Sequence, residues 1–187
     1  VVAVMGSTAT SAGYMVALGA DHVIAREGSL TGSIGVLLQT ADVTELLKRL
    51  GIKSEAIKSG SLKAQPNPLE TTTPEARQAI KRVVMDMHSM FIDMVVERRK
   101  IPIDDARVLG DGRVYTGRQA LANGLIDGIG SEIEALDWLT NKAKIPKGLL
   151  VKDVIIERTG HNWRALIGNI LGKLEFSDRL RLDGLIS

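Results

Sequence analysis

The sequence predicts an α/β domain, and three kinds of pattern carry this prediction. Short apolar runs rich in β-branched residues, such as Val1–Val4, indicate strands. Longer segments with apolar residues three and four positions apart, of which the clearest begins at Thr73, indicate helices. Glycine, proline and small polar residues separate these segments, as they do at turns. Strand and helix patterns in alternation along one chain favour an α/β fold.

The first strand and the first helix are joined by a cluster of small residues. The run Val1–Val4 stops at Gly6, and after Ser11 the pattern becomes helical, with apolar positions at Tyr14, Ala17 and Leu18. A tight turn of this kind lifts Ser11 to the sheet edge, beside the free N–H groups of the helix start. Ser11 is therefore a candidate nucleophile. The alternative is an ordinary N-cap hydroxyl, which is common at helix starts.

Two further strands are expected on either side of a glycine-punctuated turn. His22–Ala25 has the pattern of a short strand, and the turn Gly28–Gly35 leads into a third strand at Val36–Leu38. The turn lacks the lysine of a phosphate-binding loop, and no helix pattern follows it at once. Nucleotide binding is therefore not indicated.

The next segment carries a candidate base. Thr44–Leu50 predicts a short helix that ends at Gly51, and Ser54–Lys58 predicts an extended piece. A loop follows, and Lys63 lies within it. The alternative for Lys63 is a solvated surface lysine, which is what most lysines are.

The strongest helix signal begins at Thr73, which is expected as the N-cap with Pro74 as the first helical residue. One face is expected in the core, formed by Ala76, Ile80, Val83, Val84, Met87, Phe91, Met94 and Val95. A second apolar stripe consists of Met85, Ile92 and Val96. We expect it to contact another subunit or to be covered by a loop or tail, with neither favoured.

The remaining chain predicts shorter elements and a change of character near Pro146. Helices are expected over Ile103–Leu109, from the cap Thr116 to Gly124, and over Ser131–Lys144. We divide the chain into a core domain, residues 1–145, and a C-terminal extension, residues 146–187. The extension contains the basic amphipathic pattern Asn162–Leu174, which suits a membrane surface, a neighbouring subunit or its own domain.

Composition excludes several classes of protein. The 24 basic and 22 acidic residues are interspersed over 187 positions, so nucleic acid is a poor candidate partner. The absence of cysteine removes thiolate nucleophiles, and the three widely spaced histidines give a metal site little support. The given sequence contains no run of eighteen apolar residues. It starts inside a strand pattern without Met, so we expect a preceding N-terminal part.

Three polar residues without a suitable histidine partner are the remaining chemical candidates. These are Ser11 at the strand-to-helix turn, Ser33 in the glycine turn and Lys63 in the loop. A serine hydroxyl needs a base to become a nucleophile, and a neutral lysine amine can serve when its surroundings favour the uncharged form. Spacing alone does not establish the pairing, because catalytic residues are assembled by the fold.

Four blocks, in this order, resemble the signal peptide peptidase A (protease IV) family: MGSTATSAGYMVALGADHVIA, GSLTGSIGVLLQ, KSGSLKAQPNP and DGRVYTGRQALANGLID. The resemblance covers Val1 to about Ile145 and implies a Clp protease and crotonase type of fold, a spiral of repeated β-β-α units. It implies Ser11 as nucleophile, Lys63 as base and Ser33 as the hydroxyl that holds the lysine. It also implies one oxyanion-hole N–H from Ala12, where the family usually has glycine, and a second donor upstream.

The resemblance further implies a serine endopeptidase of the single-length type that needs no cofactor and cleaves extended hydrophobic peptides, such as remnant signal peptides. The expected setting is the bacterial inner (cytoplasmic) membrane, with the catalytic domain on the periplasmic or extracytoplasmic side. The missing N-terminal part would provide the membrane contact, and several copies would form a ring or dome. The alternatives are a crotonase-fold enzyme acting on acyl-CoA and a non-catalytic assembly subunit.

Overall fold

The computed structural model describes residues 1–146 and 148–154, and the chain separates into two units, Val1–Lys147 and Gly148–Ser187. The account below concerns the first unit. The expected helix over 162–174 lies outside the described residues. The expected boundary between residues 145 and 146 therefore stays a prediction.

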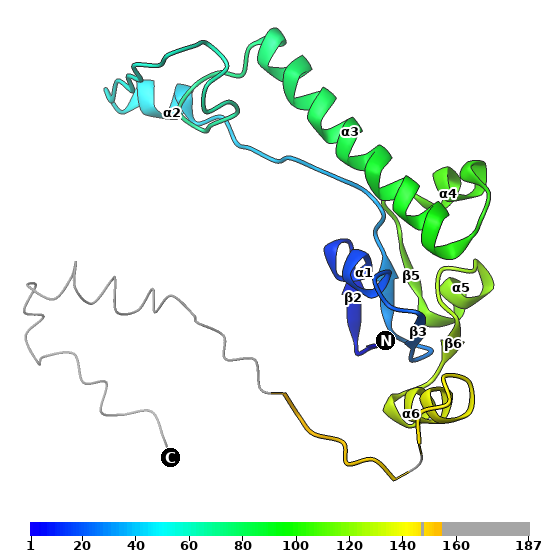
Figure 1. Cartoon of the computed structure of the whole chain (residues 1–187). Helices are drawn as coiled ribbons and strands as arrows, with labels where there is room; N and C mark the ends of the chain where they lie inside the picture. Colours follow the sequence, from blue (N-terminus) through cyan, green and yellow to red (C-terminus); the bar gives the residue numbers. More distant parts are fainter. Residues whose placement is uncertain (147, 155–187) are drawn as a thin grey trace, which may run out of the picture. The chain divides into compact units, whose positions relative to one another are not determined.

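The first unit contains two small sheets and several helices, which confirms the α/β class (Figure 1). One sheet is entirely parallel, in the order β1 (Val2–Met5), β3 (His22–Ala25) and β6 (Gly128–Ile129). The other has the order β2 (Thr8–Thr10), β4 (Leu30–Gly32) and β5 (Val114–Thr116), in which β5 runs antiparallel to β4. The strand at His22–Ala25 is confirmed.

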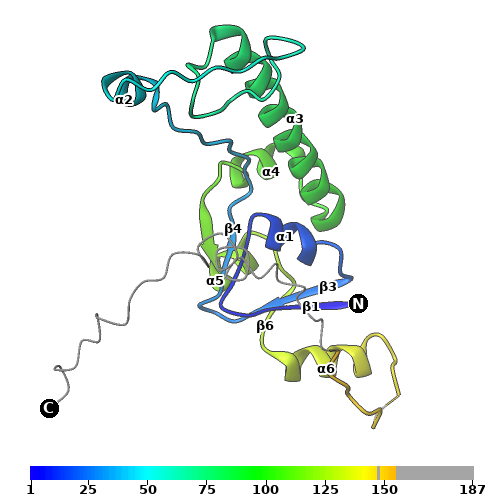
Figure 2. The same cartoon turned by 90° about the vertical axis from the view of Figure 1, so that its left-hand side faces the viewer.

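The first two strand pairs repeat one arrangement. Val2 of β1 lies opposite His22 of β3, and Thr8 of β2 lies opposite Leu30 of β4, both in parallel register. Strands β1 and β2 therefore each pair with a strand about twenty residues further along the chain. Helix α1 (Ala12–Ala17) follows β2 and contacts β1, β2 and β4 (Figure 2). This arrangement brings the carboxyl ends of β2 and β4 to one sheet edge.

The expected third strand at Val36–Leu38 is wrong. The strand of this region is β4, which ends at Gly32, and residues 33–43 form no strand before α2 begins. Gly32 has φ +76°, and an added Cβ would lie 2.5 Å from the Tyr115 ring. Gly32 and Ser33 both have positive φ, so the backbone leaves the extended conformation at this point and the strand ends.

The remaining helices agree with the expected segments to within a few residues. They are α2 (Thr44–Arg49), α3 (Pro74–Arg99), α4 (Ile103–Leu109), α5 (Gly117–Ala122) and α6 (Glu132–Asn141). The Thr73 side chain accepts a hydrogen bond from the Ala76 N–H at 3.1 Å, so the expected cap of α3 is confirmed. Thr116 and Gln119 form a reciprocal capping box at the start of α5.

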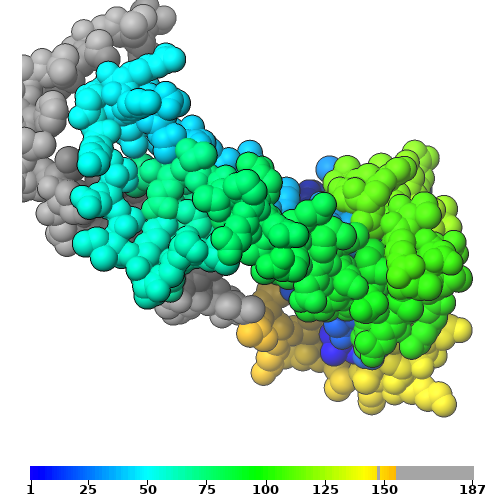
Figure 3. All heavy atoms as spheres, turned by 90° about the horizontal axis from the view of Figure 1, so that it is seen from above, coloured from blue at the N-terminus to red at the C-terminus, as the bar shows by residue number. Residues whose placement is uncertain are grey.

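Only part of the expected core face of α3 is buried. Phe91 and Val95, near the carboxyl end, are fully buried, whereas Val83 and Met87, nearer the amino end, are about half exposed. The space-filling view shows α3, in green, at the surface (Figure 3). The helix therefore joins the core through its second half.

Of the two expectations for the second stripe of α3, cover by the chain itself is the one that the structure supports. Ile92 is 3% exposed and Val96 packs against the core, so only Met85 of the three lies at the surface. The reason is α4, which packs beside α3; at its end Gly110 comes so close that a Cβ there would lie 2.2 Å from the Ile92 side chain. The chain itself covers this part of the helix.

The core holds the first helix against the end of α3. Tyr14 of α1 is buried, its ring lies 6.4 Å from that of Phe91, and its hydroxyl donates to the Leu125 carbonyl oxygen at 2.7 Å. Burial raises the pKa of Tyr14, so this hydroxyl keeps its proton. The start of α1, where Ser11 lies, is thus anchored by a ring contact and a hydrogen bond of Tyr14.

Candidate active site

Ser11 occupies a strained turn between β2 and α1. Its backbone angles are φ 52° and ψ −120°, and its half-buried side chain makes no capping hydrogen bond to the helix. A residue with a Cβ adopts positive φ only where the surrounding structure imposes it, and such residues gather at functional sites. The ordinary N-cap interpretation of the hydroxyl is therefore wrong. The geometry resembles the strand-to-helix elbow that presents nucleophiles in other hydrolases.

Ser33 lies beside this elbow, as the first residue after β4. The Ser11 N–H donates to the Gly32 carbonyl oxygen at 2.8 Å, and the Ser33 N–H donates to the Arg113 carbonyl oxygen at 2.8 Å. Ser33 also has positive φ, 52°, and is half-buried. The structure therefore brings Ser11 and Ser33 to the same sheet edge, each in a backbone conformation that its neighbours impose.

The start of α1 supplies hydrogen-bond donors next to Ser11. Ala12 and Gly13 are its first two residues, so their N–H groups have no acceptor within the helix, whereas those of Tyr14 and Met15 donate to the Ser11 carbonyl oxygen. Ala12 and Gly13 are both exposed. The Ala12 N–H is thus available to an oxygen placed near the Ser11 hydroxyl, as an oxyanion site requires.

Lys63 lies in the loop between α2 and α3 and is exposed in the single chain. Its N–H donates to the Gly60 carbonyl oxygen at 3.1 Å, and the next residue, Ala64, has φ 60°. Within the described residues, no recorded hydrogen bond or ion pair joins Lys63 to Ser11 or Ser33. The structure therefore brings the two serines together but does not bring the lysine to them.

Sequence reasoning did not find the group that closes this loop. Glu70 accepts hydrogen bonds from Lys58 and, at 2.7 Å, from the Gln65 amide. Lys58 and Glu70 are twelve positions apart, and no helix or strand lies between them to give this spacing a period. Local sequence patterns therefore do not indicate this contact.

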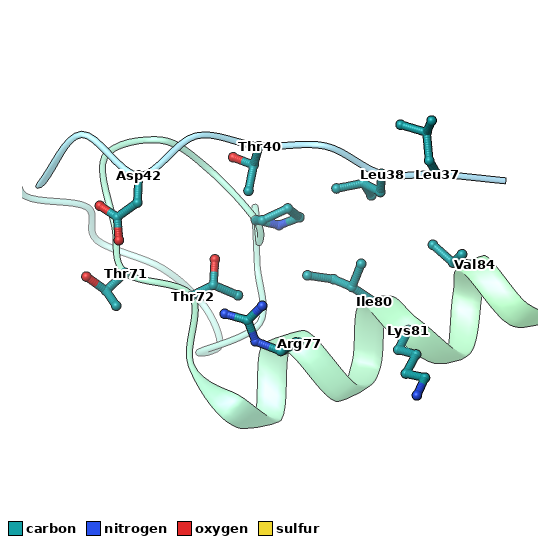
Figure 4. Close-up of a pocket in the computed structure, with 11 residues that line it drawn as sticks. Leu37, Leu38, Thr40, Asp42, Thr71, Thr72, Arg77, Ile80, Lys81 and Val84 are labelled. Atoms are coloured by element: carbon teal, nitrogen blue, oxygen red, sulfur yellow. The ribbon is translucent and has the colours of Figure 1, made fainter.

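A groove begins a few residues after Ser33 and follows the amino-terminal half of α3. Its volume is about 600 Å³, and its apolar part is formed by Leu37, Leu38, Ile80 and Val84. In the close-up, Ile80 and Val84 point toward Leu38, the Arg77 guanidinium lies near Thr72, and Lys81 points away (Figure 4). The groove thus has an apolar end toward Ser33 and a polar end toward the loop.

The described residues contain no cluster of histidine and acidic side chains suited to a metal ion. The chemical groups at the sheet edge are two hydroxyls and backbone N–H groups. They are suited to covalent catalysis by an activated serine.

The fold and the serine elbow define a candidate serine hydrolase, and comparison with known proteins gives its family. Residues 1–146 match Peptidase family S49, and the chain belongs to that family of serine-type peptidases. The expected membership of the signal peptide peptidase A group is confirmed.

Three relatives illustrate the similarity. A protein of Enterococcus faecium, provisionally named signal peptide peptidase SppA, is 35% identical over 146 residues, covering 78% of this chain and 42% of its own length. A chloroplastic serine protease SPPA of Arabidopsis thaliana is 30% identical over 190 residues, covering 100% of this chain and 28% of its own. Protease 4 of Salmonella typhi is 30% identical over 145 residues, covering 78% and 23%. The chain thus spans half or less of these relatives.

Within the described part of the chain, no helix combines the length and apolar character needed to cross a membrane.

Proposed function

We propose that this chain is the catalytic portion of a serine endopeptidase in which Ser11 is the nucleophile and Lys63 the base. The observation that carries the proposal is the Ser11 elbow, because its hydroxyl is not used for helix capping and its backbone holds an unfavourable conformation. Membership of Peptidase family S49 supports the same reaction class.

In the proposed reaction, the Ser11 hydroxyl oxygen attacks the carbonyl carbon of the scissile peptide bond while its proton passes to the neutral Lys63 amine. The Ala12 N–H and a second donor, expected upstream in the preceding N-terminal part, stabilise the resulting oxyanion. The protonated lysine then gives its proton to the leaving amine as the C–N bond breaks. Water, deprotonated by the same lysine, hydrolyses the acyl-enzyme and restores Ser11.

The Lys63 amine must reach the Ser11 hydroxyl for this reaction, and it can do so in two ways if the protein is a homo-oligomer. The base comes either from the same chain after movement of its loop or from the loop of a neighbouring copy. Ser33, next to Ser11 at the sheet edge, is proposed to hold the lysine amine by a hydrogen bond. The exposure of Lys63 in the single chain is compatible with both routes.

The proposed substrates are extended hydrophobic peptides, such as the remnants of cleaved signal peptides. Leu37 is 80% exposed and Leu38 is 51% exposed on the segment that continues from Ser33. Within the described residues, no backbone hydrogen bond is recorded for residues 35–42, so this segment has free donors and acceptors for an added peptide strand. The backbone of an extended apolar peptide would form hydrogen bonds with these backbone groups, and its side chains would cover the exposed leucines.

The proposed setting is the bacterial inner membrane, with the catalytic domain on the periplasmic or extracytoplasmic side and membrane contact through the preceding N-terminal part. The Enterococcus and Salmonella relatives are bacterial proteins, and the name of the first refers to signal peptides; this supports the setting only by analogy. We also propose that the β-β-α arrangement continues as a spiral; the pairing of β1 with β3 and of β2 with β4 supports it.

A ring or dome of several copies is proposed to enclose the sites. In place of the stripe expected from the sequence, Val83, Met87 and Met90 form an exposed apolar row on α3, with spacings of four and three residues. Such a row is unusual for a surface without a partner. Sedimentation of the full-length protein at micromolar concentration should show an oligomer, and a purely monomeric species would contradict this part of the proposal.

The proposed activity is tested with the full-length protein, a fluorogenic hydrophobic peptide and a fluorophosphonate that labels activated serines. Wild type should hydrolyse the peptide and be labelled, and Ser11→Ala should do neither. A scaffold subunit would show neither reaction in wild type, and an acyl-CoA enzyme would turn over thioesters but not peptides. Mixing Ser11→Ala with Lys63→Ala subunits then separates the two routes, because activity returns only when neighbouring copies share a site.

A further inference from the structure

Lys63 lies in the part of the loop that runs over residues 58–70, and a contact between charged side chains joins the two ends of this part. Lys58 and Glu70 form an ion pair between their Nζ and Oε2 atoms, and the Gln65 Nε2 donates to the same carboxylate oxygen at 2.7 Å. One carboxylate therefore joins three points of the loop: its start, its end and a residue two positions after Lys63. The contact encloses the turn on which Lys63 lies.

This ion pair is more sheltered than the exposed pairs among the described residues, and the pairs of Asp127 with Arg99 and His22 are comparable. The side chains of Lys58 and Glu70 are 15% and 29% exposed, whereas those of Lys48 and Glu45 in α2 are 78% and 77% exposed. Exposed pairs contribute little to stability, but a sheltered pair with an additional hydrogen bond holds its partners in one geometry. The hydrogen bond from Lys58 lowers the pKa of Glu70, so this carboxylate is charged at neutral pH.

The turn inside the loop is held in a conformation that it would not adopt alone. Ala64 has φ 60°, and its carbonyl oxygen accepts a hydrogen bond from the Asn67 amide at 3.0 Å. The Lys63 N–H donates to Gly60 and the Gln65 N–H donates to Leu62. Strain of this kind, placed next to a candidate base and held by several contacts, indicates that the direction of the Lys63 side chain matters.

The same contacts distinguish Lys58 from Lys63. The Lys58 ammonium is committed to Glu70, so it is poorly placed to accept a proton from a serine. For Lys63 no ion pair is recorded within the described residues. Glu70 is therefore suited to hold the loop in place and to keep Lys58 occupied, while Lys63 remains available.

We propose that Glu70 is a positioning residue for Lys63: its carboxylate joins Lys58 and Gln65 and thereby fixes the conformation of the turn that presents the lysine amine. The proposal rests on the proposed function, because it needs Lys63 to be the base. Glu70 itself contacts neither the substrate nor the reacting atoms. Its removal should lower the rate of the chemical step and leave substrate binding nearly unchanged.

The test uses the full-length protein and the hydrophobic peptide substrate. Glu70→Ala should lower kcat by on the order of 10- to 100-fold with KM changed less than about threefold, because the base is displaced and the groove is kept. Glu70→Gln, which keeps an acceptor for Gln65, should recover part of this loss. The matched control is Glu45→Ala, which removes an exposed ion pair in the preceding helix and should keep wild-type kinetics.

A double-mutant cycle with Lys63→Met shows whether Glu70 acts through the lysine. The readout is the slow fluorophosphonate labelling of Ser11, with thermal melting recorded for every variant. Glu70→Ala should slow labelling in wild type but have no further effect when Lys63 is methionine. An equal effect in both backgrounds, or wild-type kcat in Glu70→Ala, would overturn the proposal. If Glu70→Ala does not fold, Glu70→Gln takes its place in the cycle, with the same outcomes.

Failure of the proposed function gives a different result from failure of this inference. If Ser11→Ala and Lys63→Met both keep full activity, the serine-lysine assignment is wrong. If both lose activity and Glu70→Ala does not, only the role of Glu70 is wrong.

Discussion

The Ser11 amide N–H donates to the Gly32 carbonyl oxygen at 2.8 Å, and this bond holds the two serine-bearing turns side by side. Ser11 and Ser33 are separated by twenty-one intervening residues, yet both follow strands that end at the same sheet edge. The bond connects the backbone of the candidate nucleophile to the residue just before the candidate lysine anchor. Several predictions about catalysis and stability depend on this edge.

Ser11→Ala should abolish peptide hydrolysis and fluorophosphonate labelling while leaving the protein folded. Alanine keeps the Cβ and the backbone N–H, so the elbow and its bond to Gly32 remain, and only the hydroxyl is lost. Ser7→Ala is a suitable control, because Ser7 is an exposed serine just before β2. Wild-type turnover in purified Ser11→Ala would show that another residue is the nucleophile.

Lys63→Arg should be inactive although it keeps the positive charge. A guanidinium does not lose its proton at the pH values where peptidases work, so it cannot accept the serine proton. The control is Lys58→Arg in the same loop, which can still pair with Glu70 and should keep most of the activity. The measurement is kcat/KM of both variants. Near-normal activity of Lys63→Arg would place the base elsewhere.

Ser33→Ala should lower kcat/KM by on the order of 10- to 1000-fold, less than either change at Ser11 or Lys63. The dyad remains in this variant, but the amine loses the proposed hydrogen bond that orients it. Ser33→Asn tolerates the positive φ of this position and keeps a side-chain acceptor, so it should recover part of the loss. A loss as large as that of Ser11→Ala would instead give Ser33 a direct part in the reaction.

Gly32→Ala should destabilise the fold by about 2–4 kcal/mol, which corresponds to a fall in Tm of about 5–15 °C. The reason is twofold: Gly32 has φ +76°, and an added Cβ would lie 2.5 Å from the Tyr115 ring. Gly28→Ala is the matched control, because no atom lies within 4 Å of its added Cβ. Thermal unfolding of the two variants should differ clearly, and equal stability would contradict the described packing.

Asp127→Asn should destabilise the fold by about 1–2 kcal/mol at neutral pH, an amount reduced by the partial exposure of the group. Partial burial opposes the charged form, but hydrogen bonds from Arg99 and the Val23 N–H prevail and lower the pKa of Asp127. Because the folded-state pKa is lowered, the charged carboxylate stabilises the fold above its ordinary pKa of about 3.9. That contribution is lost as the pH falls through the folded-state value.

The measurement is the free energy of unfolding as a function of pH. The difference between wild type and Asp127→Asn should shrink as the pH falls below about 4. Asp104→Asn is the control, because its ion pair with Arg107 is exposed and 3.5 Å long, and it should change stability little. A difference for Asp127→Asn that stays constant into acid would contradict the assigned role of its charge.

Elements with a complete local signal were predicted well. The cap Thr73 with Pro74 marks the start of α3, and the chemistry of Thr116 and Gln119 marks the start of α5. These signals reside in three or four adjacent residues, because capping satisfies N–H groups that the same turn leaves free. The strand His22–Ala25 was found for a similar reason, since an apolar run bounded by turns is a local pattern.

Features that depend on contacts between distant segments were not predictable in this way. The strand expected at Val36–Leu38 is absent because positive φ at Gly32 and Ser33 ends the extended backbone. Ile92 is buried because Gly110 of another segment covers it. The contact of Lys58 with Glu70 was missed for the same reason. None of these features depends on residues at a regular helix or strand spacing, so sequence periodicity does not reveal them.

By itself, the sequence determined the α/β class, the helix caps, the peptidase family and the candidate residues Ser11, Ser33 and Lys63, because residue types and short-range patterns carry that information. Only the tertiary structure decided that Ser11 and Ser33 share one sheet edge, that the Ser11 hydroxyl is not a helix cap, and that Glu70 closes the loop of Lys63. The physical reason is that backbone strain at Ser11 and a sheltered charge at Glu70 exist only when distant segments impose and compensate them.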